Sequence, residues 1–190
     1  MSAIMKSISP KECERIVSGE QTVLVSKTRP KIDTPFKCYI YCTKGENLWL
    51  TQKGVKSKTE LTGYLMNGKV IGEFECDRIY EIKNLGSSFM IGNDIALTNR
   101  IARESCLAYP DLRTYLKDKK GYAWHISDIK IYDKPKELEE FYTIDESGSD
   151  CCCGCVYHET PLAEMPCKAC TADRRYLYRP PQSWCYIEEL

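Results

Sequence analysis

Six cysteines crowd together near the C-terminus of this 190-residue chain, and their spacing is typical of a metal site. Within the run DCCCGCVYHETPLAEMPCKAC, Cys152 and Cys155 form one Cys-x₂-Cys pair, and Cys167 and Cys170 form a second. Each such pair presents two sulfur atoms on the same side, and tetrahedral zinc takes four soft ligands at about 2.3 Å. The spacing therefore predicts one structural zinc ion held by these four thiolates.

Other ligand sets remain open for this cluster. Alternative zinc ligands are the neighbouring Cys151, Cys153 and His158, and Cys185 could be recruited from the last expected strand. An iron–sulfur cluster is a second interpretation, and a redox-reactive or irregular tail is the interpretation without a metal. A structural metal site would contribute folding free energy directly, because the unfolded segment has no preformed cage for the ion.

A stripe of cations forms a second chemical signal. Lys27, Arg29 and Lys31 occupy every second position, which in an extended segment places all three side chains on the same side. Such a stripe can follow a phosphate backbone, so we predict that it contacts nucleic acid. The alternative is a solvated strand edge whose cations discourage pairing with other chains.

Flat rings and an amide suited to base recognition occur in two further segments, Trp124-His125 and the later run RPPQSW. Rings stack on bases and amides pair with base edges, as recognition of single-stranded RNA requires. The candidate binding residues of these segments are Trp124, His125, Arg179, Gln182, Ser183 and Trp184. Alternation around Trp124 also favours a core position, and a lone histidine is often structural.

The composition limits the classes of function. Its 27 basic and 27 acidic residues give a formal net charge of zero, so the basic surplus of proteins that bind long stretches of nucleic acid is missing. No apolar run approaches the roughly 20 residues that cross a bilayer, and the N-terminal MSAIMKSISP lacks a signal-peptide pattern. We expect a cytoplasmic protein, without membrane contacts, whose cysteines are reduced or bound to metal.

The elements that must position these residues are mostly short strands. Strands are expected at 4–8, 22–27, 36–43, 69–82, 122–132 and 183–189. One helix should begin with the capping box of Ser9-Pro10-Lys11-Glu12 and stop at Gly19, and two short helices should lie between about 98 and 119, broken before Pro110. This order predicts an α+β, mostly β fold: a partly closed β-barrel decorated by short helices.

Within one domain, we expect three parts. The barrel should occupy residues 1–144, and a cysteine-rich excursion that forms the zinc knuckle should occupy 145–178. A terminal strand in 179–190 should then return to the barrel. The polar run DESGSD at 145–150 is the linker that introduces the excursion.

Five segments resemble the ASCH domains, a branch of the PUA-like superfamily that includes bacterial and phage-borne members. KSISPKECERIVSGEQTVLVSKTRPK is similar to their opening, in which a helix ending in Gly-Glu-Lys leads into a strand. The later similar segments are FKCYIYCTK, GKVIGEFECDRI, GYAWHISDIKIYDKPKELEEF and RPPQSWCYIEEL. The resemblance implies a PUA-like barrel that binds RNA, or a modified nucleotide or base, in a cleft beside Gly19-Glu20-Gln21.

The positions that are reactive in some members are altered in this chain. Gln21 stands where the family has a lysine, Leu24 where it has an acidic residue or threonine, and Ser26 where it has an arginine. In the branch that deacetylates N4-acetylcytidine, that lysine acts as nucleophile or base. Glutamine has no lone pair available for this work at neutral pH. We therefore expect a binding module rather than an enzyme, with Gln21 and Thr22 in its cleft.

Two other functions stay open at this point. One is an enzyme that acts on nucleic acid, by nuclease chemistry or by chemistry like that of the N4-acetylcytidine amidohydrolases, through residues that the sequence does not identify. The other is a phage adaptor that binds a host protein, with the zinc knuckle as its contact surface. The sequence does not specify the base, the strand type or the oligomeric state.

Overall fold

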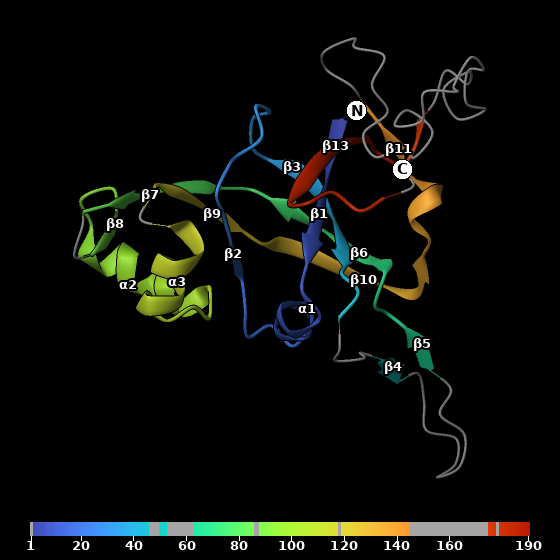
Figure 1. Ribbon diagram of the computed structural model, residues 1–190, viewed down its shortest axis with the longest axis horizontal. Coiled ribbons are helices and arrows are strands. Elements are labelled where there is room, and N and C mark those ends of the chain that lie inside the picture. Colours follow the sequence, from blue (N-terminus) through green and yellow to red (C-terminus); the bar gives the residue numbers. More distant parts are fainter. Residues whose placement is uncertain are drawn as a thin grey trace, which may run out of the picture. The chain divides into compact units, whose positions relative to one another are not determined.

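The computed structural model describes residues 2–45, 50–52, 63–85, 88–117, 119–144, 175–177 and 179–190. The chain divides into two units. Figure 1 labels their helices and strands. Unit 1 consists of Met1–Lys11, Lys37–Glu73 and Lys130–Leu190, and unit 2 consists of Glu12–Phe36 and Phe74–Ile129. Each unit is described by itself.

Unit 1 is built on a seven-stranded sheet with the order β10-β6-β3-β1-β13-β11-β12. Its strands are β1 (Ser2–Ile8), β3 (Phe36–Cys42), β6 (Lys69–Cys76), β10 (Ser127–Lys136), β11 (Tyr142–Thr143), β12 (Arg175–Tyr176) and β13 (Trp184–Glu188). Strand β1 pairs in parallel with β3 and antiparallel with β13. A short hairpin of β4 (Leu50–Gln52) and β5 (Gly63–Leu65) and the 3₁₀ helix η1 (Leu138–Glu140) complete the described part of this unit.

The core of unit 1 forms where β1 and β3 carry apolar side chains on both faces. Met5 on β1 and Tyr39 on β3 are completely buried, and the Tyr39 ring packs edge-on against Phe141 at 5.1 Å between centroids. Gly72 lets β6 and β10 approach closely, because a Cβ at that position would collide with the backbone oxygen of Lys130. A strand that is apolar on both faces, as β3 is, is the type expected at a central position of a sheet.

A polar network crosses the same sheet. The Tyr132 hydroxyl on β10 donates to Glu73 Oε2 on β6 at 2.5 Å, and Lys37 Nζ on β3 lies 4.0 Å from Glu73 Oε1. Lys37 also pairs with Glu189 at 3.0 Å, which raises the pKa of the lysine. Burial, together with the bond to Glu73, raises the pKa of Tyr132 well above that of an ordinary phenol.

The Tyr132 network predicts how stability responds to alkaline pH. An unfolded tyrosine ionises near pH 10, about its usual pKa, whereas the folded Tyr132 resists ionisation. The resulting stabilisation is fully present below pH 10 and is lost as the pH rises above it. In urea unfolding series, wild type should lose free energy of unfolding above pH 10 more steeply than Tyr132→Phe. Tyr176→Phe, a change at an exposed tyrosine, should match wild type; equal slopes for all three proteins would contradict this assignment.

Unit 2 contains a four-stranded antiparallel sheet with the order β2-β9-β7-β8. Its strands are β2 (Val23–Ser26), β9 (Gly121–His125), β7 (Ile79–Asn84) and β8 (Phe89–Ile91), and its two later helices are α2 (Ile95–Glu104) and α3 (Tyr109–Leu116). Both helices lie next to β7 and β8 in Figure 1, and they contribute Ile101 and Leu116 to the core of this unit. Asp94 caps α2 through a bond from Leu97 N at 3.0 Å.

Several sequence predictions are confirmed here. Helix α1 (Pro10–Val17) begins at the expected proline, and Gly19 follows it with a φ of 76°, a conformation that glycine adopts readily. The two short helices are present, and α3 carries Pro110 in its first turn, where proline is tolerated. The expected α+β, mostly β composition is what the described residues show, and the strand orders of the two larger sheets are open at their edges. None of the helices in the described part combines the length and apolar character of a membrane span.

Two strand predictions were wrong. The expected strand 69–82 is broken at Asp77 and Arg78 into β6 and β7, which belong to different sheets. The expected strand 122–132 is likewise broken at Ile126 into β9 and β10. At both breaks the backbone changes hydrogen-bond partners, as when His125 N donates to Arg78 O at 2.9 Å. Residues 145–174 and 178 lie outside the described residues, so the boundaries at 145 and 179 stay predictions.

Candidate functional site

The loop after α1 is fixed in unit 2 by its backbone. Gln21 N donates to Arg15 O at 3.0 Å, which closes the loop onto the helix that precedes it. Thr22 N donates to Glu104 O at 3.0 Å, at the end of α2. Cys106 Sγ donates to Glu20 O at 3.5 Å. The loop is therefore a positioned element, and its side chains have defined surroundings.

Gln21 is a buried amide that is only half satisfied. Its side chain is 2% exposed, and Nε2 donates to Val23 O at 3.0 Å. That bond fixes the orientation of the amide, and Oε1 is left buried without a hydrogen-bond partner among the described residues. Leaving a buried acceptor unsatisfied costs about 1–3 kcal/mol. Oε1 would therefore accept from an N–H or O–H group, but a ligand reaches this buried atom only after the side chains that cover it have moved.

An aspartate–histidine pair lies one strand away from Gln21. Val23 pairs with His125 in the register of β2 and β9, and Ile126 N donates to Thr22 O at 2.9 Å. The His125 Nδ1 atom lies 2.6 Å from Asp77 Oδ1, and the two side chains are 33% and 31% exposed. The carboxylate orients the imidazole ring and leaves Nε2 as the other ring nitrogen available for a ligand.

Asp77 and Arg78 are site residues that sequence reasoning missed. The strand expected over 69–82 runs through both residues, so neither stands out as a site residue in the sequence. In the structure Arg78 is exposed beside the pair, and its guanidinium Nη1 donates to Tyr80 Oη at 3.4 Å. The available signal was the DR dipeptide at the end of an alternating run, which marks the strand break. Gln21, Thr22, Asp77, Arg78 and His125 are named here the β2-start cluster.

Trp124 is placed in the core. It is 0% exposed and sits in β9 between Leu24 on β2 and Ile79 on β7. Phe36 meets it edge-on, with 5.8 Å between centroids and 87° between the ring planes. A base could stack on this ring only after its neighbours had moved. Trp124 therefore has the core position that the alternation around it also favoured.

The three alternating cations are exposed, but they do not continue a strand. Strand β2 ends at Ser26, and bends at 27–28 and 31–32 interrupt the extended course that was expected. Alternation therefore no longer places Lys27, Arg29 and Lys31 on one side. Lys27 Nζ lies 4.8 Å from the centroid of the Tyr115 ring, in a cation–π contact.

The C-terminal candidates belong to unit 1. Arg179 and Gln182 are exposed, whereas Ser183 and Trp184 are half-buried at the start of β13. Ser7 anchors this segment, since its N–H donates to Ser183 O at 2.9 Å and its hydroxyl to Pro181 O at 2.6 Å. Trp184 stacks edge-on with Tyr186 at 5.4 Å. Only the exposed members of this group are free to meet a ligand without rearrangement.

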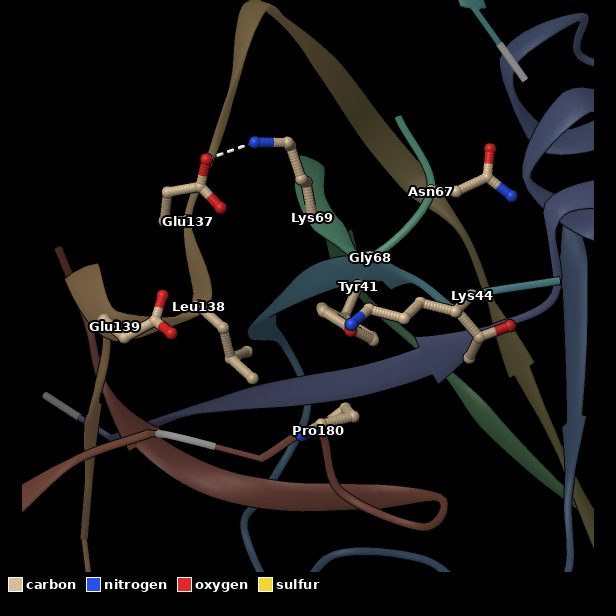
Figure 2. A pocket seen from close by; sticks show the side chains of 10 residues that line it. Tyr41, Lys44, Asn67, Gly68, Lys69, Glu137, Leu138, Glu139 and Pro180 are labelled. Atoms are coloured by element: carbon tan, nitrogen blue, oxygen red, sulfur yellow. Dashed lines mark hydrogen bonds and ion pairs between the residues drawn. The ribbon is translucent and has the colours of Figure 1, made fainter. Parts of the chain in front are cut away.

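Unit 1 also contains a polar cavity beside this segment, with a volume of about 560 Å³ (Figure 2). Its wall carries two lysines and two glutamates on segments far apart in the sequence. The lining residues are Tyr41, Thr43, Lys44, Asn67, Gly68, Lys69, Glu137, Leu138, Glu139 and Pro180. Sequence reasoning did not identify this cavity.

The zinc ligands cannot be placed. Cys152, Cys155, Cys167 and Cys170 lie outside the described residues, as do the alternatives Cys151, Cys153 and His158. Cys185, the remaining alternative, is half-buried in β13. Where the chain is described, no group of three or more histidine, cysteine, aspartate or glutamate side chains could hold a metal ion.

Comparisons with known proteins establish the fold. No protein-family model matches the chain, and no curated protein does. Among solved structures, the ASCH protein of Zymomonas mobilis matches with a TM-score of 0.55 and 18% identity, covering 98% of this chain and 88% of that one. A serine-to-alanine variant of that protein gives a TM-score of 0.55 and 17% identity, covering 98% of this chain and 89% of that one. A tyrosine-to-phenylalanine variant of the same protein gives a TM-score of 0.53 and 18% identity, covering 98% of this chain and 91% of that one.

The class of structure is thereby defined. The described sheets and helices have the ASCH-type arrangement, and the predicted α+β, mostly β, partly closed fold is confirmed. At this level of identity the likeness extends to the fold alone. What the chain binds must be argued from its own residues.

Proposed function

We propose that the chain is a binding module for RNA, or for a modified nucleotide or base, and that the ligand is recognised at the β2-start cluster beside Gly19-Glu20-Gln21. The observation that carries the proposal is the buried Gln21 amide, held by Val23 O and left with one acceptor oxygen. Each RNA base presents at least one N–H donor, so this acceptor can bond any of them once the side chains that cover it move aside.

The neighbours of Gln21 support the same ligand. The half-exposed imidazole of His125 offers a flat face for stacking and a ring nitrogen for a hydrogen bond, and Asp77 holds it in place. Exposed Arg78 supplies a cation for a phosphate, and Lys27, Arg29 and Lys31 are exposed cations of the same unit. With a net charge of zero, the chain is suited to a short recognition site rather than to a long tract of nucleic acid.

The experiment measures the affinity of short single-stranded RNA of random sequence by fluorescence anisotropy at low salt. Gln21→Ala and His125→Ala should each weaken binding about tenfold, the factor expected for one lost hydrogen bond of roughly 1.4 kcal/mol. Asn93→Ala, which removes an exposed amide elsewhere in unit 2, should leave the affinity unchanged. Circular dichroism shows whether each variant keeps the fold. Wild-type affinity in folded Gln21→Ala and His125→Ala would remove this site.

The Asp77–His125 pair supports a second candidate, an enzyme that acts on nucleic acid. A carboxylate-bound imidazole can accept a proton from a hydroxyl or a water molecule, as a general base does. Gln21 cannot replace a reactive lysine, so such an enzyme would differ from the amidohydrolase branch. Mass spectrometry of RNA and nucleosides incubated with the chain distinguishes the two functions: retained, unchanged ligand supports binding, whereas new products that vanish in His125→Ala support catalysis.

A further inference from the structure

The polar cavity of unit 1 brings charged side chains together from three separate segments. Lys44 follows β3, Lys69 begins β6, and Glu137 and Glu139 come from the turn around η1. Its volume of about 560 Å³ falls in the range of roughly 300–1,000 Å³ that is usual for small-molecule sites. The cavity is large enough for a ligand with several functional groups.

Two of these charges are already neutralised, and two are not. Lys69 Nζ forms an ion pair with Glu137 Oε1, marked by the dashed line in Figure 2. Lys44 and Glu139 have no ion pair or side-chain hydrogen bond to another residue in the described ranges. Among the described residues, the cavity therefore presents one ammonium group and one carboxylate without a partner.

The turn at Gly68 positions the Lys44 side chain. A Cβ added to Gly68 would lie 3.1 Å from Lys44 Cε, so the lysine stem packs against this glycine. Gly68 has a φ of 79°, in the left-handed region, and the turn returns to β3 through Gly68 N, which donates to Cys42 O at 2.7 Å. Figure 2 shows Lys44 and Glu139 entering the view from opposite sides. A ligand that meets both groups lies between Lys44 and Glu139.

Tyr41 adds a third group that is available to a ligand. The residue is 3% exposed and lines the cavity, and its hydroxyl has no hydrogen-bond partner within the described part of the chain. Burial, with smaller contributions from Cys42 and Glu139, raises the pKa of this phenol. The hydroxyl therefore stays protonated at neutral pH and can either donate or accept.

The chemistry of these groups selects a ligand. An ammonium group pairs with a phosphate. A carboxylate only accepts hydrogen bonds, and guanine is the base that places two donors, N1–H and the N2 amino group, side by side for it. Adenine and cytosine place an acceptor next to their amino group, and uracil flanks its single N–H with two carbonyl oxygens, so each would meet repulsion at the carboxylate.

We infer that this cavity is a site for a guanosine monophosphate group, with the phosphate on Lys44 and the donor edge of guanine on Glu139. The group is either a free mononucleotide or the terminal residue of an RNA. Tyr41 bonds the ligand between these two ends, and the Pro180 ring forms an apolar wall. The inference is drawn from unit 1 alone and does not depend on the β2-start cluster of unit 2.

The test is isothermal titration calorimetry, which measures the affinity of the full chain for each ligand. The ligands are GMP, AMP, IMP, guanosine and a short RNA that ends in guanosine 5′-monophosphate. GMP should bind more tightly than IMP, which lacks the 2-amino group, and more tightly than AMP. Lys44→Ala should weaken GMP about tenfold and leave guanosine unchanged, and Glu139→Gln should remove most of the preference for GMP over AMP. Matched controls are Lys134→Ala and Glu75→Gln, exposed residues that do not line the cavity.

Each outcome supports or overturns the inference. Tighter binding of the RNA end than of GMP supports it and identifies RNA as the source, and the reverse order identifies a free nucleotide. Absence of GMP binding, equal binding of AMP, or wild-type affinity for GMP in folded Lys44→Ala overturns it. Loss of GMP binding in Gln21→Ala but not in Lys44→Ala would assign the nucleotide to unit 2 instead. Loss of RNA binding only in the unit 2 variants, while GMP still binds through Lys44, supports the inference as a site separate from the β2-start cluster.

Discussion

Trp124→Ala is expected to destabilise the chain by about 3–5 kcal/mol, the usual cost of truncating a buried large aromatic residue. The side chain is completely buried, and it packs edge-on against Phe36 in the middle of the four-stranded sheet. Removing the indole leaves a cavity that the flanking strands β2 and β7 cannot close without losing register. Urea unfolding, followed by circular dichroism, measures the loss.

Two further variants separate packing from recognition at this position. Trp124→Phe keeps an aromatic ring and should recover part of the lost stability. Trp184→Ala, at a half-buried position, should cost clearly less than Trp124→Ala. If Trp124→Ala were as stable as wild type and bound RNA much more weakly, the ring would have to be a stacking platform and the packing described above would be wrong.

The second large effect concerns metal. We propose that the cysteine cluster binds one structural zinc ion through Cys152, Cys155, Cys167 and Cys170, and this proposal rests on spacing alone. Elemental analysis of chain purified without added metal should give about one zinc per molecule. The double variant Cys155→Ser/Cys167→Ser should lose the metal, because a serine hydroxyl is a poor zinc ligand at neutral pH.

Cys106→Ser is the matched control for the zinc experiment. Its thiol is in the described part of unit 2 and donates to Glu20 O, so the change should leave the zinc content at the wild-type value. Zinc well under half an equivalent in the wild-type chain would remove the proposal. Iron in place of zinc, with visible absorbance, would favour the iron–sulfur interpretation.

Local signals in the sequence predicted much of the fold. Pro10 and Gly19 mark the two ends of α1, and apolar residues on both faces mark β3 as a central strand. The breaks at Asp77-Arg78 and at Ile126 were not predicted, because alternation is a property of one strand, whereas a change of sheet depends on which distant strand supplies the hydrogen bonds. His125 N, for example, bonds Arg78 O.

The candidate site was predicted less completely, for the same reason. Gln21 and His125 were each identified by residue type, but their proximity follows from the register Val23↔His125, which no local pattern contains. Asp77 lies inside the strand expected over 69–82, and its contact with His125 depends on the fold. Lys44 and Glu139 carried no signal at all, because the cavity wall is assembled from separate turns.

The central claim is that RNA or a nucleotide is bound at the start of β2, and cross-linking tests it most directly. Short single-stranded RNA is cross-linked to the full chain with ultraviolet light, and mass spectrometry identifies the modified peptides. We predict modified residues within 19–22, 77–80 or 125, and a strong reduction of these cross-links in Gln21→Ala. Cross-links confined to other segments, with the same yield in Gln21→Ala, would contradict the proposed site.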